Sequence, residues 1–420
     1  MATKPFEIVI LGGNFGGLGV AHFLLRHSIP SLQALDKNAR FHITLVSPNS
    51  KAYFKVGSPR TLVQPQLLPE AKLWKPLSEA FAQYSSEQIT VIQALAIKIL
   101  PDERTVTIMF KSPSPDQVDE RSIPYDALFI ATGTSAENPI WTLHEDETMT
   151  SRIFAQLHKA LPSAKTILIG GGGPVGVETA GEIASVHRDA EITLLSGGER
   201  LLPRVKSAVG ARAEEQLKQL GVKVVHGVEV IHGGRAPGSE SASQVSLSDD
   251  TSRTVDVYID ATGGAANSHF VPEEWLGELG PGRDQAAHRV KTRDAYFRVA
   301  DGVYAVGDIV SGSGSTLFEL DAMVPTACSA FVVDVAKKLN TEPATSGGLL
   351  GMFFRGGASV PVEKEFKPLR NTIIVPIGPD GGVGLVMGWQ VPSWFVRVAK
   401  SKTFLIDMFD TVVSGSKWKA

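Results

Sequence analysis

The sequence has a single cysteine, Cys328, among its 420 residues. One cysteine excludes an internal disulfide, a redox-active cysteine pair and a cysteine-rich metal site, and we expect no metal. The chain also lacks an apolar run close to the roughly 20 residues that span a bilayer. Its net charge is only −3 and its pI about 6.4, which argues against a nucleic-acid partner. We therefore expect a cytoplasmic protein, and its length and ordinary composition indicate two or three globular domains.

Two glycine-rich turns are the most informative features that the chain does have. The first lies in the segment Phe6–Leu25, and the second lies in the segment Ala164–Ala184, each after an apolar, strand-like run. A strand, a glycine turn and a helix in this order form the dinucleotide-binding fingerprint, in which glycines let the backbone approach a pyrophosphate at a helix N-terminus. The first turn contributes Gly12, Gly13, Asn14, Phe15, Gly16 and Gly17, and the second contributes Gly171, Gly173, Pro174, Val175 and Gly176. Two such turns predict two dinucleotides and electron transfer between them.

Three further motifs complete an order that resembles the two-dinucleotide flavoproteins. Val303–Val310 reads as a strand ending in Gly-Asp, and Phe129–Ser135 and Tyr258–Gly264 each contain Ala-Thr-Gly. In that family the acid, here Asp308, binds the ribityl chain of FAD. The Ala-Thr-Gly hinges lead from each nucleotide domain into the next segment, and their predicted cofactor contacts are Ala131, Thr132, Gly133 and Gly263. The resemblance implies FAD in the first domain and NADPH or NADH in the second.

This motif order predicts an α/β fold with two Rossmann-like dinucleotide-binding domains. The FAD domain is expected at residues 1–149 and 265–340, because its Gly-Asp motif lies after the second fingerprint. The NAD(P)H domain, at residues 150–264, is therefore inserted into it. Residues 341–420 are expected to form a small C-terminal α+β domain.

The first fingerprint departs from the consensus in two places. Asn14 stands where the second glycine is usual, and asparagine tolerates left-handed backbone geometry better than most residues. Ser47, not an acid, stands at the end of the second strand, Phe41–Ser47. Either Ser47 and Asn49 bind the adenosine ribose, or backbone groups hold that end of the cofactor.

The flavoprotein resemblance implies further FAD contacts. Arg60 is expected to support the FAD pyrophosphate, since guanidinium suits phosphate, and Lys55 to face the flavin edge. The alternative for both is a solvated surface cation. Ala96 is included among the FAD contacts. Val324 is included as well, because Pro325 is expected to open a helix whose N–H groups bind the flavin pyrimidine carbonyl.

The second fingerprint is complete, and its surroundings bear on nucleotide choice. The resemblance places Glu178, expected in the first turn of the following helix, near the nicotinamide–flavin contact, with helix capping as the alternative. Ser196 occupies the position of the acid that selects NAD, and Arg200 nearby suits the 2′-phosphate of NADP. We expect NADPH to be used at least comparably to NADH.

Over nearly the whole chain the motif set resembles the apoptosis-inducing-factor-like oxidoreductases of the ferroptosis-suppressor type, close to type II NADH dehydrogenases. Lys367, in the segment Glu365–Leu369, aligns with a lysine near the quinone and flavin of that group. The resemblance implies an FAD-dependent NAD(P)H oxidoreductase that passes electrons to a quinone-like small molecule. Glu178 and Lys367 are its predicted catalytic residues.

Two other functions remain open at this point. One is a flavin-dependent oxidase or reductase of a specialised metabolite, and the other is a redox-sensing NAD(P)H-binding flavoprotein. The tail Trp394–Trp418 mixes apolar and cationic residues. It either rests on a bilayer as a peripheral contact, or packs on the FAD domain or in a dimer. The protein is expected to be a monomer or a homodimer.

Overall fold

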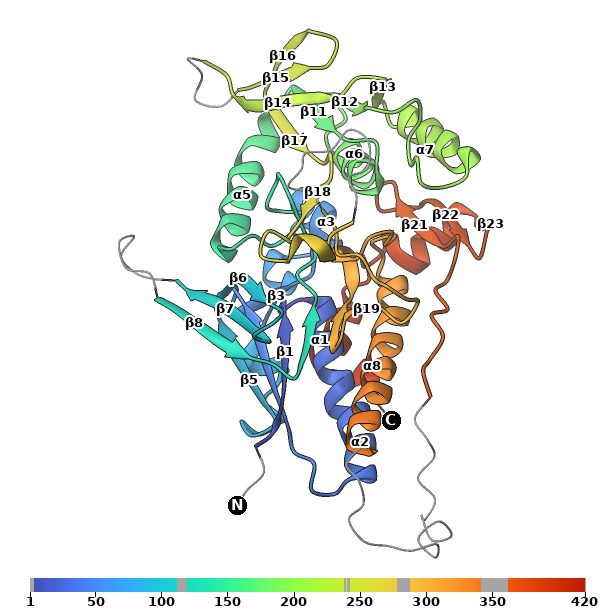
Figure 1. Cartoon of the computed structure of the whole chain (residues 1–420). Coiled ribbons are helices and arrows are strands. Elements are labelled where there is room, and N and C mark those ends of the chain that lie inside the picture. Colours follow the sequence, from blue (N-terminus) through green and yellow to red (C-terminus); the bar gives the residue numbers. More distant parts are fainter. Residues whose placement is uncertain are drawn as a thin grey trace, which may run out of the picture.

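The structure is a computed structural model that describes residues 4–111, 119–237, 239, 242–277, 288–340 and 362–419. Two sheets of mainly parallel strands, each flanked by helices, lie one beyond the other along an elongated molecule (Figure 1). The predicted α/β class with two Rossmann-like cores is confirmed. Among the described residues, no helix combines the length and apolar character that crossing a membrane requires.

The first sheet has six strands in the order β19-β20-β9-β1-β2-β5, and every adjacent pair except β19–β20 is parallel. Its strands are β1 (Phe6–Leu11), β2 (Phe41–Ser47), β5 (Ile89–Gln93), β9 (Ala127–Ile130), β19 (Arg298–Ala300) and β20 (Val303–Ala305). The last four residues of β1 are buried on both faces, as expected for a central parallel strand covered by helices. Because β20 joins β9 after the second domain, the first domain is built from two separate parts of the chain.

The helices of this domain include α1 (Phe15–Phe23), which continues through a π-helical turn (Leu24–Ser28) into α2 (Ile29–Leu35). The others are α3 (Ser58–Val63), α4 (Leu77–Ala80) and α8 (Leu317–Asn340). Its smaller sheets pair β3 (Lys51–Tyr53) with β4 (Trp74–Pro76), and β6 (Leu95–Leu100) with β7 (Thr105–Phe110) and β8 (Asp119–Pro124).

The long helix α8 corrects one expectation. It begins at Leu317, so Pro325 lies inside the helix and not at its start. Val324 is fully buried, and its side chain lies close to Gly19 of α1. A mid-helix residue has its N–H directed along the helix. The predicted donation from a helix start at this position to the flavin is therefore wrong.

The second sheet has four parallel strands in the order β13-β12-β11-β17. They are β11 (Thr166–Gly170), β12 (Glu191–Ser196), β13 (Lys223–His226) and β17 (Val257–Asp260), with helices α5 (Glu147–Ala160), α6 (Pro174–Val186) and α7 (Ser207–Gln219). An antiparallel sheet of β14 (Val230–Arg235), β15 (Ser243–Leu247) and β16 (Ser252–Val255) packs on it through a small apolar cluster.

The two chain crossings between the domains pair with each other. β10 (Thr134–Ala136) and β18 (Gly264–Ala266) form an antiparallel ribbon directly after the two Ala-Thr-Gly hinges. The Thr132 hydroxyl donates to the Asn267 carbonyl, and the Asn267 amide donates to the Thr132 carbonyl. The connection between the domains is therefore a paired ribbon.

The C-terminal segment forms a small sheet of β21 (Ile373–Pro376), β22 (Gly382–Val386) and β23 (Trp389–Gln390), followed by α9 (Ser393–Val396), a π-helical turn (Arg397–Ser401) and α10 (Asp407–Val413). Phe404 and Phe409 are at most 1% exposed, and Phe409 packs on Phe15 and Phe54 of the first domain. Of the two readings of the tail, packing on the FAD domain describes most of it.

His22 of α1 holds this tail from a fully buried position. Its Nε2 lies 2.8 Å from the carbonyl oxygen of Val413, and its Nδ1 lies 3.1 Å from the hydroxyl of Tyr84. Burial lowers the pKa of His22 from 6.5 to about 4, although the bond to Val413 opposes the shift. The folded protein therefore needs this imidazole neutral.

We expect the free energy of unfolding to fall as the pH drops from about 6.5 to about 4, because the unfolded chain then binds a proton that folded His22 does not. The contribution, about 3 kcal/mol, is fully present above the unfolded pKa. His22→Gln should flatten this part of the profile in urea titrations at several pH values. Tyr84→Phe, which removes one bond of His22 and leaves the imidazole, should keep the slope. An unchanged slope in His22→Gln would contradict the assignment.

Candidate functional site

The two glycine turns are built alike. Gly12 and Gly171 have φ of +114° and +117°, which only glycine adopts without strain. A Cβ on Gly12 would lie 2.4 Å from the Ala131 carbonyl oxygen, and one on Gly171 would lie 2.2 Å from that of Ala261. The first glycine of each turn thus lies against the Ala-Thr-Gly segment of its own domain, and the backbone of the turn packs closely on that segment.

The last glycine of each fingerprint closes the turn onto its helix. A Cβ on Gly17 would lie 1.7 Å from the carbonyl oxygen of Gly12, and one on Gly176 would lie 1.9 Å from that of Gly171. Among the described residues no side chain caps α1 or α6, and neither helix has an acid in its first turn. The first N–H groups of both helices are thus available to an anion. Both turns fit the pyrophosphate of a dinucleotide.

The second position of each fingerprint differs between the turns. A Cβ on Gly173 would meet nothing within 4 Å, so the second turn is open there. Asn14 has φ of −111°, so its tolerance of left-handed geometry is not the reason for its presence. Its side-chain amide instead donates to the Tyr53 carbonyl at 3.1 Å and accepts from the Tyr53 N–H at 3.4 Å. Asn14 ties the first turn to β3.

The other residues of the two turns are also closely surrounded or lie at the start of a helix. A Cβ on Gly13 would lie 2.6 Å from the side chain of Ser47, and one on Gly16 would lie 3.3 Å from that of Ala131. Phe15 is 7% exposed and stacks on Phe409 at 5.9 Å between ring centroids. Pro174 and Val175 are the first residues of α6.

The end of β2 offers a site for a ribose hydroxyl. The Ser47 hydroxyl donates to the carbonyl of Asn49 at 3.0 Å, so it stabilises the local turn. The side-chain nitrogen of Asn49, Nδ2, donates to the His144 carbonyl at 2.7 Å. No donor among the described residues reaches its buried Oδ1. This acceptor fits a ribose hydroxyl, and it makes Asn49 a stronger candidate than Ser47.

Ala96 is a buried residue of β6.

Asp308 and Lys55 form an ion pair where the first domain holds its predicted cofactor. Lys55 Nζ lies 2.6 Å from Asp308 Oδ2, and both side chains are partly buried. Burial alone would raise the pKa of Asp308, but Lys55 and Arg289 hold it below its usual range. Asp308 is therefore a carboxylate acceptor at neutral pH, as its predicted role with the ribityl chain requires.

Arg60 is not placed as the sequence predicted. Its guanidinium is 3% exposed and makes two bonds to Glu182 of α6, at 2.5 and 2.9 Å. It also donates to the Ser401 carbonyl at 3.0 Å. The predicted support of the FAD pyrophosphate is therefore wrong, because Glu182 neutralises this charge inside the protein. The solvated-cation alternative is wrong as well.

Glu178 lies in the second turn of α6, since the helix begins at Pro174. The capping alternative is therefore wrong. The carboxylate is 4% exposed and lies 2.6 Å from Lys400 Nζ. Burial raises the pKa of Glu178 above its usual range, although Lys400 opposes the shift. A buried carboxylate next to a buried ammonium is a polar centre between the second domain and the tail.

Lys400 is a residue that sequence reasoning missed, and Lys367 was predicted in its place. The Lys367 side chain is 75% exposed, and its Nζ lies 3.0 Å from Glu365 on the surface. This exposed surface position does not fit the catalytic role predicted for Lys367. Lys400 stands in a run of basic and apolar residues that gives no local sign of an inward-pointing lysine. Only the contact with α6 singles it out.

At the nucleotide-selecting position, the Ser196 hydroxyl donates to the carbonyls of Gly198 and Arg200, within its own loop. The Arg200 guanidinium donates to the carbonyls of Pro203 and Val205 at 2.7 and 2.8 Å. It braces the loop after β12, and binding of a 2′-phosphate stays a prediction. Gly263, with φ of +117°, ends the second hinge.

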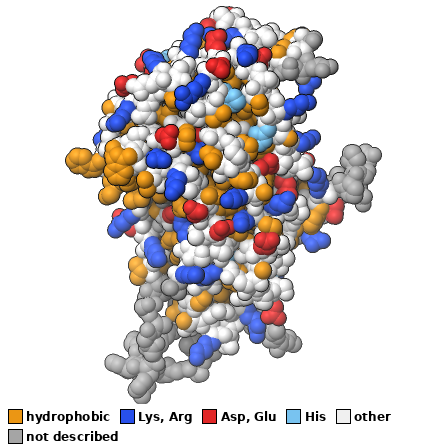
Figure 2. All heavy atoms as spheres, turned by 180° about the vertical axis from the view of Figure 1, so that it is seen from behind, with side chains coloured by type: hydrophobic (Ala, Val, Ile, Leu, Met, Phe, Trp, Pro, Cys, Tyr) orange, Lys and Arg blue, Asp and Glu red, His pale blue; other side chains and the backbone are white. Residues whose placement is uncertain are grey.

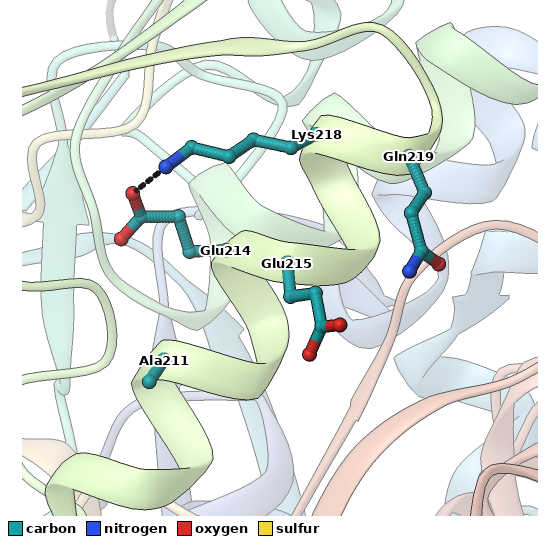
Figure 3. Close-up of a pocket in the computed structure, with 5 residues that line it drawn as sticks. All are labelled: Ala211, Glu214, Glu215, Lys218 and Gln219. Carbon is teal, nitrogen blue, oxygen red and sulfur yellow. Dashed lines mark ion pairs between the residues drawn. The ribbon is translucent and has the colours of Figure 1, made fainter.

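Other candidate sites carry less chemistry. A surface hollow runs along α7, and its lining side chains all come from that one helix (Figure 3): Ala211, Glu214, Glu215, Lys218 and Gln219. Lys218 Nζ pairs with Glu214 at 2.7 Å, as helix neighbours four apart often do. Within the described part of the chain, no three His, Cys, Asp or Glu side chains are arranged to hold a metal ion.

Comparison with known proteins gives the family. The sequence model of the family described as pyridine nucleotide-disulphide oxidoreductase matches residues 6–326. The chain belongs to this family. Oxidoreductase phnG of Penicillium herquei is 29% identical over 439 residues, covering 99% of this chain and 98% of that protein. Ferroptosis suppressor protein 1 of Homo sapiens is 22% identical over 416 residues, covering 96% and 95%.

Solved structures share the fold. The sulfide:quinone oxidoreductase of Aquifex aeolicus has a TM-score of 0.68 at 15% identity, covering 98% of this chain and 92% of that one. NDH2 of Plasmodium falciparum in complex with NADH has a TM-score of 0.61 at 14% identity, covering 97% and 98%. The predicted family resemblance is confirmed. As a member of the pyridine nucleotide-disulphide oxidoreductase family, the chain is a flavoprotein oxidoreductase that depends on FAD and NAD(P)H.

The Asp308 assignment predicts the FAD affinity of two variants. Asp308→Asn should weaken FAD binding about 10- to 100-fold, because a hydrogen bond to a charged acceptor is worth about 1.5–3 kcal/mol. Lys55→Met, which removes the competing partner and keeps the carboxylate, should retain FAD better than Asp308→Asn. Flavin fluorescence titration of the deflavinated proteins measures both. Wild-type affinity in Asp308→Asn would refute the role.

Proposed function

We propose that this member of the pyridine nucleotide-disulphide oxidoreductase family passes electrons from NAD(P)H through FAD to a quinone-like small molecule. The observation that carries the proposal is the state of Cys328, the chain's single cysteine, which is fully buried in α8. Burial raises the pKa of its thiol, so it is not a nucleophile. Without a dithiol, electrons leave the flavin directly, and the acceptor we propose for them is a quinone-like small molecule.

The overall reaction would convert NAD(P)H, a proton and a quinone into NAD(P)⁺ and a quinol. Bound FAD would supply the hydride-accepting and electron-donating chemistry of this reaction. The protein's part is to bind and orient. The turn at Gly12 would hold the FAD pyrophosphate and the turn at Gly171 that of NAD(P)H, while Asp308 would accept a hydrogen bond from the ribityl chain.

Glu178 and Lys400 would orient the nicotinamide. Both lie beyond the Gly171 turn, on the side of α6 that faces the tail, and their 2.6 Å contact fixes both side chains. Lys400 Nζ also donates to the Ile374 carbonyl at 3.3 Å, which anchors it to β21. Because Lys400 holds the Glu178 carboxylate in place, this carboxylate can position the amide group of the nicotinamide. Lys400 is thus a positioning residue that acts through Glu178.

Transient kinetics with a panel of acceptors tests the proposal. The purified flavoprotein is reduced with NADPH or NADH and then mixed with a water-soluble quinone, with oxygen, or with buffer. Reoxidation by the quinone much faster than by oxygen supports the proposal. Slow reoxidation by every acceptor, with tight nucleotide binding, would instead support a redox sensor. Reoxidation confined to other organic compounds would support a metabolite oxidase or reductase.

The Glu178–Lys400 contact predicts slower flavin reduction when it is broken. Lys400→Met and Glu178→Gln should each lower the rate of flavin reduction by NAD(P)H by about 10- to 100-fold, because the nicotinamide is less well placed. The matched control is Lys402→Met, an exposed lysine two residues away. Stopped-flow absorbance of the flavin measures the rate. A purely structural contact would leave that rate unchanged in variants that retain FAD.

The Arg200 loop predicts the nucleotide preference. NADPH should be used at least comparably to NADH, since Ser196 offers no carboxylate to repel a 2′-phosphate. Arg200→Ala should raise KM for NADPH more than KM for NADH. Steady-state kinetics with both nucleotides measures the ratio. Equal increases for both would show that Arg200 only braces its loop through Pro203 and Val205.

A further inference from the structure

An acidic side chain from outside the second fingerprint lies on the loop that follows β12. A Cβ on Gly197, the first residue after that strand, would lie 2.6 Å from Glu229 Cγ and 2.8 Å from Glu229 Oε1. The Glu229 carboxylate therefore lies directly over the Gly197 backbone. Glu229 follows β13, the neighbouring strand of the sheet, and none of the sequence motifs pointed to it.

Backbone hydrogen bonds hold Glu229 at this place. The Gly227 N–H donates to the Gly198 carbonyl at 3.2 Å, so the chain leaving β13 stays beside the loop that leaves β12. The Glu229 N–H donates to the Ser248 hydroxyl oxygen at 2.9 Å, and the Glu229 carbonyl accepts from the Ser248 N–H at 2.9 Å. The position of this acid is therefore set by the fold of the second domain.

The loop under Glu229 packs against the second glycine turn. The Leu202 N–H donates to the Gly172 carbonyl at 2.8 Å, and a Cβ on Gly172 would lie 2.5 Å from Ser196 Oγ. In a dinucleotide-binding domain, the residue at the end of the second strand faces the 2′-position of the adenosine ribose. Ser196 has that place here, and Glu229 lies over the residue next to it.

The other polar side chains of this loop bind the loop itself. The Ser196 hydroxyl and the Arg200 guanidinium both donate to carbonyls between residues 198 and 205. Glu229 is exposed, and within the described part of the chain no hydrogen bond or ion pair engages its carboxylate. A carboxylate accepts through two oxygens, so it suits the two neighbouring hydroxyls of a ribose.

The charges around this end of the molecule have no single sign. Figure 2 shows basic and acidic side chains mixed over the end that carries β12, β13 and β14 in Figure 1. A nucleotide phosphate therefore meets a potential that the nearest charged groups determine, because exposed charges further away than about 10 Å are screened at 0.1 M salt. Glu229 is the acid that the geometry places on the loop itself.

We propose that Glu229 determines nucleotide choice: its carboxylate accepts from the adenosine ribose hydroxyls of NADH and repels the 2′-phosphate of NADPH. It thereby takes the role that an acid at the position of Ser196 has in NAD-selecting domains. The proposal rests on the proposed function, in which the second turn binds NAD(P)H. The comparable use of the two nucleotides is then a balance, in which Glu229 favours NADH and Arg200 is predicted to favour NADPH.

Binding of two adenosine probes to the full-length flavoprotein tests the proposal without hydride transfer or an acceptor. The probes are AMP and adenosine 2′,5′-bisphosphate, measured by isothermal titration calorimetry. Glu229→Gln removes the charge and keeps the shape of the side chain. We expect it to shift the ratio of the two dissociation constants about tenfold or more toward the bisphosphate, because the repulsion and the charged acceptor are both lost. Glu199→Gln, at an exposed acid of the same loop, is the matched control and should keep the wild-type ratio.

The salt dependence distinguishes a charge effect from a change of loop shape. The distance over which exposed charges act falls from about 10 Å at 0.1 M salt to about 3 Å at 1 M. The difference between the wild type and Glu229→Gln in binding the bisphosphate should therefore shrink over this range. A difference caused by an altered loop would persist at high salt.

The outcomes separate this proposal from the proposed function. Retained flavin content and an unchanged unfolding midpoint show that both variants are folded. A shift in Glu229→Gln alone that shrinks with salt supports the proposal. An unchanged ratio in Glu229→Gln, an equal shift in Glu199→Gln, a shift that salt leaves intact, or no binding of either probe by the wild type overturns it. If the shift is found but the reduced flavin passes no electrons to a quinone, the proposed acceptor is wrong and the role of Glu229 stands.

Discussion

The ion pair between Arg60 and Glu182 is the contact on which the arrangement of the molecule depends. Arg60 comes from α3 of the first domain, Glu182 from α6 of the second, and the Ser401 carbonyl from the tail. Both side chains are almost fully buried. Removing one partner of such a pair leaves a charge in the interior at a cost of about 3–5 kcal/mol. All three parts of the chain must therefore dock together for either charge to be satisfied.

The same helix carries the second buried pair, one turn earlier. Glu178 and Glu182 of α6 each form an ion pair with a cation, and both cations lie over the Phe404 ring. The ring centroid is 4.9 Å from the Arg60 guanidinium carbon and 5.9 Å from Lys400 Nζ. A cation over an aromatic face gains attraction, especially away from water. The structural pair and the pair proposed to position the nicotinamide thus both contact Phe404. Movement of the tail would change both together.

The sequence predicted the features that local backbone chemistry determines. The glycine turns and the hinges follow from short motifs with fixed geometry, and β20, which comes after the second sheet in the chain, pairs with β9 of the first sheet. The acceptor role of Asp308 stays a prediction, with which its lowered pKa is consistent. The errors concern contacts between distant segments. Arg60 was assigned by its affinity for phosphate, but a buried glutamate 122 residues away binds it. The sequence alone does not show whether Lys367 or Lys400 lies in the candidate site, because only the fold determines which side chain points into the protein.

The start of α8 shows a different limit of sequence reasoning. Proline favours the first turn of a helix, so Pro325 predicted a helix start. The structure instead continues the helix eight residues further toward the N-terminus, and the adjoining Val324 is covered by α1. Tertiary packing outweighs the local preference here. Asn14 shows the same effect, since its side chain binds Tyr53, which lies outside its own motif.

The difference between the two glycine turns has a consequence for residence time. Asn14 ties the first turn to β3, and the Phe15 beside it is covered by Phe409 of the tail. Nothing lies within 4 Å of a Cβ at Gly173, so the second turn has no such strap. A closed turn suits a group that stays through many cycles, whereas an open turn suits one that enters and leaves in each cycle. Within one repeated architecture, Asn14 and the covered Phe15 thus distinguish a closed turn, suited to a resident group, from an open turn, suited to an exchanging one.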